Sequence, residues 1–327
     1  MQAVRPQSRE IQSPTRPDRS HHPYGASAPL LFLSCQTQIS NLLLAMTHPI
    51  WQTSRYALDL TQPKVMGIVN LTPDSFSDGG RHANLSSALE HAQTLLAQGA
   101  DMLDIGGESS RPGAEPVSAE EELKRVLPFL QEALTWNVPI SVDTYKPQVM
   151  QAALDLGVDV VNDIWALRQA GALQVVARHP QCGVCLMHMH REPQTMLAQP
   201  MTGDALPLVK DFLSKQVLKL RDSGVQANRI VLDPGIGFGK TVEQNLSLLQ
   251  RQSELLSLGH ALMAGWSRKG TLGKLTAIQG QSPQPQDRVG ASVAAALIAV
   301  QNGASVVRVH DVKETVQALR VWQALKI

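Results

Sequence analysis

The stretch IVLDPGIGFGKTVEQNLSLL, residues 230–249, contains the unit on which the fold of this chain is built. Its apolar start ends in Asp233 and a glycine-rich turn, and from residue 242 onward apolar side chains recur at helical spacing. An apolar run without alternation is typical of a strand covered on both faces. The stretch therefore predicts a buried β-strand that leads through a loop into an amphipathic α-helix.

The same unit recurs eight times from residue 65 onward. Apolar runs that predict strands lie at 65–70, 102–107, 140–143, 160–163, 184–189, 230–235, 262–267 and 306–311. Amphipathic stretches that predict helices lie at 86–98, 119–134, 146–156, 170–178, 205–223, 242–258, 288–301 and 312–325. Alternating strands and helices imply parallel crossovers, and eight units match an α/β (βα)8 TIM barrel in number and size. A doubly wound open sheet is the alternative, and the lack of a break between units favours closure.

The first 48 residues differ in composition from the rest of the chain. They are rich in Pro, Ser, Arg and Gln and show no periodicity, so we expect a disordered extension or sequence upstream of a true start at Met46. A transit peptide is the alternative, because the segment is rich in Arg and poor in acidic residues. The barrel is then expected as a single domain over residues 49–327.

Charge and composition bear on the class of partner. Lys+Arg total 29 and Asp+Glu 28, for a net charge of +1, and aromatic residues make up 4%, so we expect no nucleic-acid partner. No apolar run reaches the roughly 18 residues that span a membrane, so we expect no membrane segment. Three cysteines, an odd and sparse number, suit a reducing cytoplasm. Cys182 and Cys185 have redox spacing, but they run into an apolar segment, where thiols are mostly small core hydrophobes.

Polar side chains stand at the end of every predicted strand, which is where barrels of this kind carry their chemistry. They are Asn70, Asp104, Asp143, Asn162 with Asp163, His188, Asp233, Ser267 with Arg268 and Lys269, and Arg308 with His310. Strand exits often carry an Asp or Asn as a turn former, and Asp104, Asp163 and Asp311 are candidates for such structural roles. Polar groups at all eight exits exceed that expectation and indicate a site.

The glycine-rich turn at 235–239 looks like a phosphate-binding loop only at first sight. A Walker A loop needs Gly five residues before its Gly–Lys pair, and Pro234 occupies that position. The G-x-G-x-x-G pattern fails as well, because Lys240 stands where its last Gly belongs. We expect these glycines to keep side chains away from a flat ligand, with Asp233 directed at its edge.

Four of the strand-end residues fit the edge of a flat aminopyrimidinone. Asp143 and Asp233 accept hydrogen bonds, Asn162 both accepts and donates, and Lys269 donates. That set matches a pterin or guanine-like edge, with its donors beside its acceptors. A solvated loop lysine is the competing interpretation of Lys269.

The last strand adds an anion-binding element. Arg308 and His310, two positions apart on one strand, point to the same side. With Asn70 across the mouth and Mg²⁺, which prefers hard oxygen ligands and bound phosphates, they fit a diphosphate. His188 and His190 have similar spacing but no evident third ligand, so we expect no zinc site.

Eight motifs in chain order resemble the dihydropteroate synthase family. They are MGIVNLTPDSFSDGG (66–80), DIGGESSRPGA (104–114), SVDT (141–144), VND (161–163), LMHM (186–189), LDPGIGFGK (232–240), GWSRK (265–269) and VRVHDV (307–312). The resemblance implies a TIM barrel, usually homodimeric, that works in folate biosynthesis with Mg²⁺. It joins 6-hydroxymethyl-7,8-dihydropterin diphosphate to p-aminobenzoate and gives 7,8-dihydropteroate and diphosphate. Because no pyrophosphokinase domain is fused to the sequence, we expect a monofunctional, bacterial-type enzyme.

The resemblance also implies roles for the matching residues. Its catalytic set is Asp78, Lys269, Arg308 and His310. The pterin is bound by Asp143, Asn162, Met187, Asp233, Gly237, Phe238 and Lys269, with Arg308 across its face. Asn70 contacts Mg²⁺, and the diphosphate is bound by Asn70, Arg308 and His310. The p-aminobenzoate is bound by Phe76, Ser110, Arg111, Pro112 and Ser267, and sulfonamides compete for that position in the family.

The implied chemistry needs no Ser–His–Asp triad. Loss of diphosphate develops charge that Mg²⁺, Arg308 and His310 stabilise, while Asp78 helps to stabilise the cation left on the pterin methylene. The aniline nitrogen is already a nucleophile at neutral pH, so no strong base is required. Closure of the loops after the first two strands excludes water, which would otherwise capture the cation.

The chain departs from the family pattern at three places. Ser110 stands where many members have Thr, His190-Arg191 where Gln-Gly is common, and Trp266 where a smaller residue is common. None of these changes removes an implied catalytic group. The alternatives are a pterin-binding methyltransferase domain that presents methyltetrahydrofolate to a cobalamin protein, an aldolase with Lys269 as Schiff base, and a barrel that binds without catalysis. The SRK and RVHD motifs favour the synthase.

Overall fold

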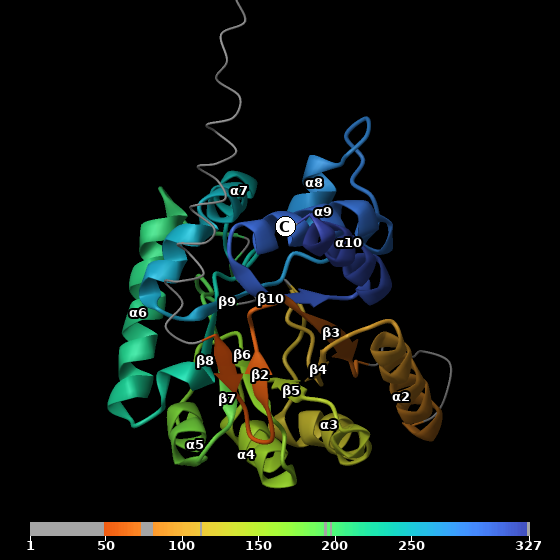
Figure 1. Ribbon diagram of the computed structural model, residues 1–327, viewed down its shortest axis with the longest axis vertical. Coiled ribbons are helices and arrows are strands. Elements are labelled where there is room, and N and C mark those ends of the chain that lie inside the picture. The colour runs from red at the N-terminus through yellow and green to blue at the C-terminus, as the bar shows by residue number, and fades with distance from the viewer. Residues whose placement is uncertain (1–48, 73–80, 112, 193–194, 197, 326–327) are drawn as a thin grey trace, which may run out of the picture. The chain divides into compact units, whose positions relative to one another are not determined.

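The computed structural model describes residues 49–72, 81–111, 113–192, 195–196 and 198–325. The N-terminal extension predicted at 1–48 lies outside these residues, and so do Phe76, Asp78 and Pro112. Figure 1 shows the described part as strands at the centre with helices around them.

Eight parallel strands form a closed barrel in the order β10-β3-β4-β5-β6-β7-β8-β9. Their bounds are β3 (Lys64–Asn70), β4 (Met102–Gly106), β5 (Ile140–Asp143), β6 (Val160–Asp163), β7 (Gly183–Met187), β8 (Ile230–Asp233), β9 (Ala261–Ala264) and β10 (Ala304–Val309). The last strand pairs with the first, from Val306 opposite Lys64 to Val309 opposite Gly67. The predicted TIM barrel is confirmed, and the open sheet is excluded.

Helices follow the strands and cover the outside of the barrel. They are α2 (Arg81–Ala97), α3 (Ala119–Ala133), α4 (Pro147–Leu156), α5 (Ala172–Arg178), α6 (Ala205–Asp222), α7 (Val242–Gln250), α8 (Gly270–Leu275), α9 (Val289–Gln301) and α10 (Val312–Ala324). The helix predicted at 242–258 breaks at Arg251 into α7 and a 3₁₀ segment, Gln252–Leu258. Helix α8 was not predicted, because its six residues are too few to show a period.

A two-stranded hairpin, β1 (Ile50–Gln52) and β2 (Ala57–Asp59), precedes the barrel and was not predicted. Strands of three residues are too short to show alternation. Trp51 of the hairpin is buried with Met66 and Met102 from inside the barrel, and its indole N–H donates to the carbonyl of Arg229 at 3.0 Å. The hairpin therefore covers the amino ends of the strands.

The barrel interior changes from apolar to polar along the strands. Next to the hairpin, the interior cluster contains Met66, Met102, Val160, Cys185, Val231 and Val306. Because side chains alternate along a strand, the same inward face two residues further on carries Asp104, Asn162, Asp233 and Arg308. The fold thus leaves a polar floor at the carboxyl ends of the strands.

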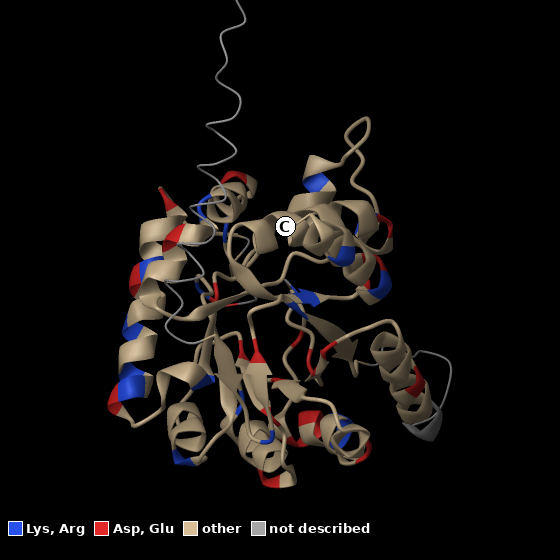
Figure 2. Cartoon of the chain, viewed as in Figure 1, with Lys and Arg blue, Asp and Glu red and all other residues tan. Residues whose placement is uncertain are grey.

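The outer face of the barrel is apolar and packs against the helices in the main hydrophobic core. Cys182 lies in this core and Cys185 inside the barrel, both as free thiols, and burial raises the pKa of both. In the view of Figure 2, acidic and basic residues are mixed along the outer helices. Among the described helices, none is both long enough and apolar enough to cross a membrane.

Candidate active site

Neighbouring strands bring four inward positions into one row. Asn70 pairs with Gly106, Gly106 with Asp143, and Asp143 with Asn162. A Cβ on Gly106 would lie 3.6 Å from Asp143 Cβ and 3.9 Å from Asn70 Oδ1. The missing side chain at Gly106 therefore leaves the Asn70 and Asp143 side chains open to a common space.

Arg308 reaches across the barrel to two carboxylates. Its Nε lies 2.6 Å from Asp104 Oδ2, and its terminal nitrogen Nη2 lies 2.7 Å from Asp143 Oδ2. Asn162 Nδ2 donates to the same oxygen of Asp104 at 2.9 Å. Asp104, which the sequence suggested as a structural orienter, thus holds both Arg308 and Asn162. The Asn162 carbonyl oxygen makes no hydrogen bond within the described residues and remains an acceptor.

The charged groups of this cluster shift one another's pKa values. Burial acts to lower the pKa of Arg308, but Asp104 and Asp143 outweigh it and the net shift is upward. Burial raises the pKa of Asp143 to about 7, with Arg308 opposing the shift and Asp104 adding to it. Arg308 therefore stays charged, while Asp143 changes charge near neutral pH.

Two glycines of the loop after β8 are required by backbone conformation and by close packing against the chain after β7. Gly235 (φ 68°) is so close to the chain after β7 that a Cβ there would overlap the carbonyl oxygen of His188. A Cβ on Gly239 (φ 70°) would lie 2.6 Å from the carbonyl oxygen of His190. At these two positions backbone conformation and close packing by themselves require glycine, and clearance for a ligand stays a prediction. Asp233 accepts from the Gly235 N–H at 2.7 Å, which fixes its carboxylate at the mouth.

Lys240, the residue that gave the stretch its phosphate-loop appearance, is turned inward. Its ammonium donates to the carbonyls of Gly235 at 2.7 Å and of His188 and Phe238 at 3.3 Å each. Burial lowers the pKa of Lys240 to about 7, with Asp233 opposing the shift. Lys240 stabilises the loop from within, which agrees with the rejection of a nucleotide loop from the sequence.

Lys269 reaches the mouth beside the glycine-rich loop. Its ammonium donates to the Ile236 carbonyl and lies 4.8 Å from the centroid of the Phe238 ring. A Cβ on Gly237 would lie 3.2 Å from Lys269 Cδ. Burial lowers the pKa of Lys269 to about 8, and Asp233 opposes the shift. Lys269 is therefore no solvated loop lysine.

The mouth also has an apolar side. Met187 and Phe238 are buried in one small cluster with Met189, Met196 and Ile164. Because an apolar surface and an aromatic ring stand next to hydrogen-bonding groups, the site suits a flat heterocycle with a polar edge.

Ser267 and His310 form a pair between the last two strand exits. Ser267 Oγ lies 2.9 Å from His310 Nδ1 and accepts the His310 backbone N–H at 3.1 Å. Burial lowers the pKa of His310 to about 3, and Arg308 adds to the shift. The sequence predicted an anion-binding element from Arg308 and His310 on this strand. Here His310 is neutral, and Arg308 carries the positive charge.

Other strand-end residues have structural contacts. The His188 ring packs edge-on against Phe212 at 5.0 Å between centroids, and burial lowers its pKa to about 2. Asp163 accepts from two backbone N–H groups of the turn that follows it. Asp311 pairs with Arg268 at 2.5 Å. The partners of these three side chains thus lie outside the cluster of Arg308, Asp104, Asp143 and Asn162.

The p-aminobenzoate residues that the family resemblance implies are described only in part. Ser110 is half-buried and Arg111 is exposed, both on the loop between β4 and α3. Phe76, Asp78 and Pro112 lie outside the described residues.

The departures from the family pattern fall around the site. Trp266 is 1% exposed and packs in the outer core, so its ring does not enter the mouth. The His190 backbone N–H donates to the Phe238 carbonyl at 3.4 Å, and Arg191 is exposed with φ 62°.

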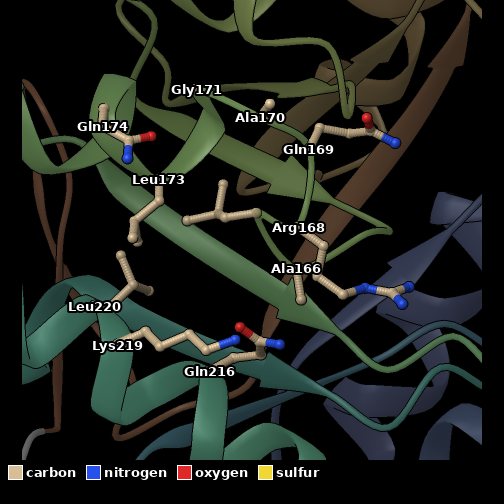
Figure 3. A pocket seen from close by; sticks show the side chains of 11 residues that line it. Ala166, Arg168, Gln169, Ala170, Gly171, Leu173, Gln174, Gln216, Lys219 and Leu220 are labelled. Atoms are coloured by element: carbon tan, nitrogen blue, oxygen red, sulfur yellow. The ribbon is translucent and has the colours of Figure 1, made fainter.

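A separate cavity of about 280 Å³ lies on the outside of the barrel, between the β6–α5 connection and α6 (Figure 3). Gln216 and Lys219 of α6 and Leu173 of α5 line it. None of its lining residues belongs to the polar cluster at the mouth. It is therefore distinct from the candidate active site.

The closed barrel and the site at its carboxyl end, which suits a flat heterocycle with a polar edge, define the class of the chain: a barrel enzyme that binds a pterin-like ring. In agreement, residues 66–310 match the pterin binding enzyme family. A dihydropteroate synthase of Neisseria meningitidis serogroup B is 48% identical over 287 residues, which cover 86% of this chain and 99% of that protein.

Two solved dihydropteroate synthases have the same fold. The Xanthomonas albilineans enzyme with 4-aminobenzoic acid is 46% identical, with a TM-score of 0.79 over 86% of this chain and 99% of that chain. The Burkholderia cenocepacia enzyme complexed with 7,8-dihydropteroate is 47% identical, with a TM-score of 0.76 over 85% of this chain and 96% of that chain. This chain belongs to the dihydropteroate synthase family, whose members are transferases of folate biosynthesis.

Proposed function

We propose that this chain condenses 6-hydroxymethyl-7,8-dihydropterin diphosphate with p-aminobenzoate to give 7,8-dihydropteroate and diphosphate. The observation that carries the proposal is the Arg308 bridge between Asp104 and Asp143, which lies on the same floor as Asp233. That floor offers acceptors for the pterin edge and a permanent cation for the departing anion. Membership of the family supports the same activity.

The pterin lies across the mouth in this proposal. Asp143 and Asp233 accept from its N–H groups, Asn162 offers its free carbonyl oxygen, and Lys269 donates to its acceptors. Phe238 and Met187 provide the apolar wall, and the Arg308 guanidinium stacks on the ring face. Because Asp104 and Asp143 already fix Arg308, binding costs little ordering of this side chain.

The leaving diphosphate lies toward β10 and β3. Arg308 supplies a fixed positive charge where negative charge develops, and neutral His310 donates a hydrogen bond from the ring nitrogen that Ser267 leaves free. Approach of a diphosphate also favours protonation of His310, since an opposite charge raises the pKa of an imidazole.

Asn70 fits a role as the protein ligand of Mg²⁺. Its amide oxygen faces the shared space next to Gly106 and makes no hydrogen bond within the described residues. The nearby carboxylates of Asp104 and Asp143 are engaged by Arg308, and among the described residues no cluster of three His, Cys, Asp or Glu side chains forms a metal site. A hard oxygen ligand of this kind suits Mg²⁺ that takes its other ligands from phosphate and water. When bound, Mg²⁺ supplies additional charge stabilisation to the diphosphate.

The p-aminobenzoate approaches from the loop after β4. Ser110 and Arg111 contact this substrate in the proposal, and Ser267 receives its carboxylate. The carbon–oxygen bond to diphosphate breaks first and leaves a cation on the pterin methylene carbon. The aniline nitrogen attacks this carbon and then loses a proton to solvent. Phe76, Asp78 and Pro112 remain predictions for the walls of this position.

We also propose a homodimer, with a surface on α7, α8 and α9. Helix α7 contacts both α8 and α9, and the three helices carry exposed large apolar side chains: Leu246 is 38% exposed, Leu275 48% and Ile298 44%. Ile278, just after α8, is 78% exposed. Apolar side chains gathered on neighbouring helices are typical of an interface between copies. Sedimentation measurements on Leu275→Glu, compared with the exposed Leu208→Glu on α6, test this surface.

The decisive experiment is a diphosphate-release assay with the dihydropterin diphosphate, with and without p-aminobenzoate. Release that requires p-aminobenzoate and gives dihydropteroate supports the synthase. Binding of the pterin without release indicates a binding barrel. Methyl transfer to a cobalamin protein indicates the methyltransferase alternative, which the family membership does not favour.

A further inference from the structure

One side chain, Glu108, joins the two ends of the loop between β4 and α3. We refer to the point where residues 108 and 117 meet as the neck of this loop. Glu108 Oε2 accepts the backbone N–H of Val117 at 2.9 Å. The two residues are nine positions apart, and Ser110 and Arg111 lie between them. This hydrogen bond therefore joins the start of the loop to its end and shortens the free segment that bears both residues.

Two residues that follow β5 hold Glu108 in place. Lys146 Nζ lies 2.5 Å from Glu108 Oε2, and the Tyr145 hydroxyl donates to Glu108 Oε1 at 2.9 Å. Lys146 is the N-cap residue directly before α4, and it lies only three residues after Asp143, the last residue of β5. The loop that bears Ser110 is thus fastened to the strand exit that bears the Asp143 carboxylate.

The same ammonium has a second carboxylate partner outside the loop. Lys146 Nζ lies 2.5 Å from Glu122 Oε2 on α3, and the Glu122 side chain is 1% exposed. Burial acts to lower the pKa of Lys146, but its bonds to Glu108 and Glu122 outweigh it and the net shift is upward. Lys146 is therefore charged, and both of its ion pairs are charge-assisted bonds of the stronger kind.

The point where the loop leaves the barrel is fixed as well. Arg125 of α3 donates to the Gly107 carbonyl at 2.9 Å. A Cβ on Gly107 would lie 2.8 Å from both Glu122 Cγ and Val126 Cγ1, so the chain packs tightly on α3 there. With its first residue packed and its neck closed, the loop presents Ser110 and Arg111 from a fixed base.

We propose that Glu108, held by Lys146 and Tyr145, is a positioning residue for the second substrate. By closing the neck, it pre-orients Ser110 and Arg111 relative to the pterin held at Asp143, and a pre-oriented loop binds p-aminobenzoate at lower entropic cost. This inference rests on the proposed function, because it takes the loop as the p-aminobenzoate side of the site.

The experiment compares Glu108→Gln with Glu122→Gln. Both variants replace one carboxylate partner of Lys146 with a neutral amide, but only Glu108→Gln weakens the neck. Its amide oxygen can still accept from Val117 or Lys146, but it carries no charge, and its NH₂ group replaces the oxygen that accepts from the Tyr145 hydroxyl. We expect Glu108→Gln to raise KM for p-aminobenzoate by about tenfold or more, with the Kd for the pterin diphosphate within about twofold of wild type. Glu122→Gln is expected to leave both constants near wild type, and Lys146→Arg, which can still bind both carboxylates, to stay closer to wild type than Lys146→Met.

Amide hydrogen exchange provides a readout that does not depend on turnover. We expect faster exchange at Val117 and in the 109–117 peptide of Glu108→Gln, and no change there in Glu122→Gln. An unchanged KM for p-aminobenzoate, or equal changes in the two variants with only a loss of thermal stability, overturns the positioning role. If the wild type makes no dihydropteroate, the proposed function fails, while the exchange comparison still decides whether Glu108 closes the neck.

Discussion

Arg308 Nη2 lies 2.7 Å from Asp143 Oδ2, although the two residues are 165 positions apart in the chain. Asp143 ends β5 and Arg308 belongs to β10, so the contact crosses the interior of the barrel. Asp143, the predicted pterin acceptor, and Arg308, the predicted anion-binding residue, therefore form one ion pair. Changes to either residue should affect binding of both the pterin and the diphosphate parts of the substrate.

Arg308→Lys is expected to lower kcat/KM by about 10²-fold or more, because an ammonium cannot bridge Asp104 and Asp143 as the planar guanidinium does. Steady-state kinetics with both substrates checks this. Arg55→Lys is the control, since Arg55 also pairs with a buried carboxylate, that of Asp159 at 2.6 Å, but it does so in the hairpin and with one carboxylate only. The control should lose stability and keep its kinetic constants; equal kinetic effects in the two variants would contradict the role of Arg308.

Asp233→Asn is expected to weaken pterin binding by about 100-fold or more while the barrel stays folded. The Asn carbonyl can still accept the Gly235 N–H, which Asp233 accepts at 2.7 Å, but its NH₂ group faces a donor edge. Calorimetric titration with a pterin and circular dichroism provide the two measurements. Asp211→Asn, an exposed change on α6, is the control, and wild-type affinity in Asp233→Asn would falsify the assignment.

Pterin binding is expected to strengthen as pH rises through about 7. Burial raises the pKa of Asp143 from its ordinary value near 3.8 to about 7, and the ionised carboxylate is the form that accepts from the pterin. Between these two values the native state binds more protons than the unfolded state. The contribution of Asp143 to the free energy of unfolding therefore falls as pH rises from about 4 to 7.

The pH dependence is checked by titrations between pH 5.5 and 8.5, roughly the range that brackets this ionisation, on wild type and Asp143→Asn. The variant should lack the transition near pH 7. A transition of the same size in Asp143→Asn would assign it to another group.

Removal of Mg²⁺ is expected to lower turnover and weaken binding of the pterin diphosphate, but to leave thermal stability unchanged. The reason is that Asn70 alone fits as a protein ligand, so the metal depends on the phosphates for most of its ligands. Chelation followed by kinetics and a thermal melt without substrate checks both parts. Asn70→Ala should raise the Mg²⁺ concentration required for half-maximal activity. A lower melting temperature after chelation would point to a structural metal instead.

Lys240→Met is expected to reduce the free energy of unfolding by roughly 3 kcal/mol, because the carbonyls of His188, Gly235 and Phe238 lose their shared donor. Chemical denaturation measures the change. Lys215→Met is the control: its lysine is 66% exposed and pairs with Asp211 on the helix surface. The control should change stability by no more than about 0.5 kcal/mol, and a similarly small loss in Lys240→Met would show that the loop holds without its ammonium.

The sequence alone determined the barrel and selected the residues of its candidate site. Continuous apolar runs and helical spacing are local patterns, and their eightfold repetition left little choice of architecture. The rule that barrel chemistry lies at the carboxyl ends of strands then selected residues such as Asp143, Asp233 and Lys269. The two short strands of the hairpin were missed because three residues carry no readable period.

Only the tertiary structure decided which groups those residues contact and which of them carry charge. It showed that Asp104 holds Arg308 and Asn162, that Lys240 faces the loop carbonyls, and that Gly235 is required by the nearby chain. Each of these facts depends on contacts between strands and loops far apart in sequence, where packing and burial fix direction, partner and charge. A one-dimensional pattern records which groups reach the mouth, but their mutual orientation arises only when the barrel closes.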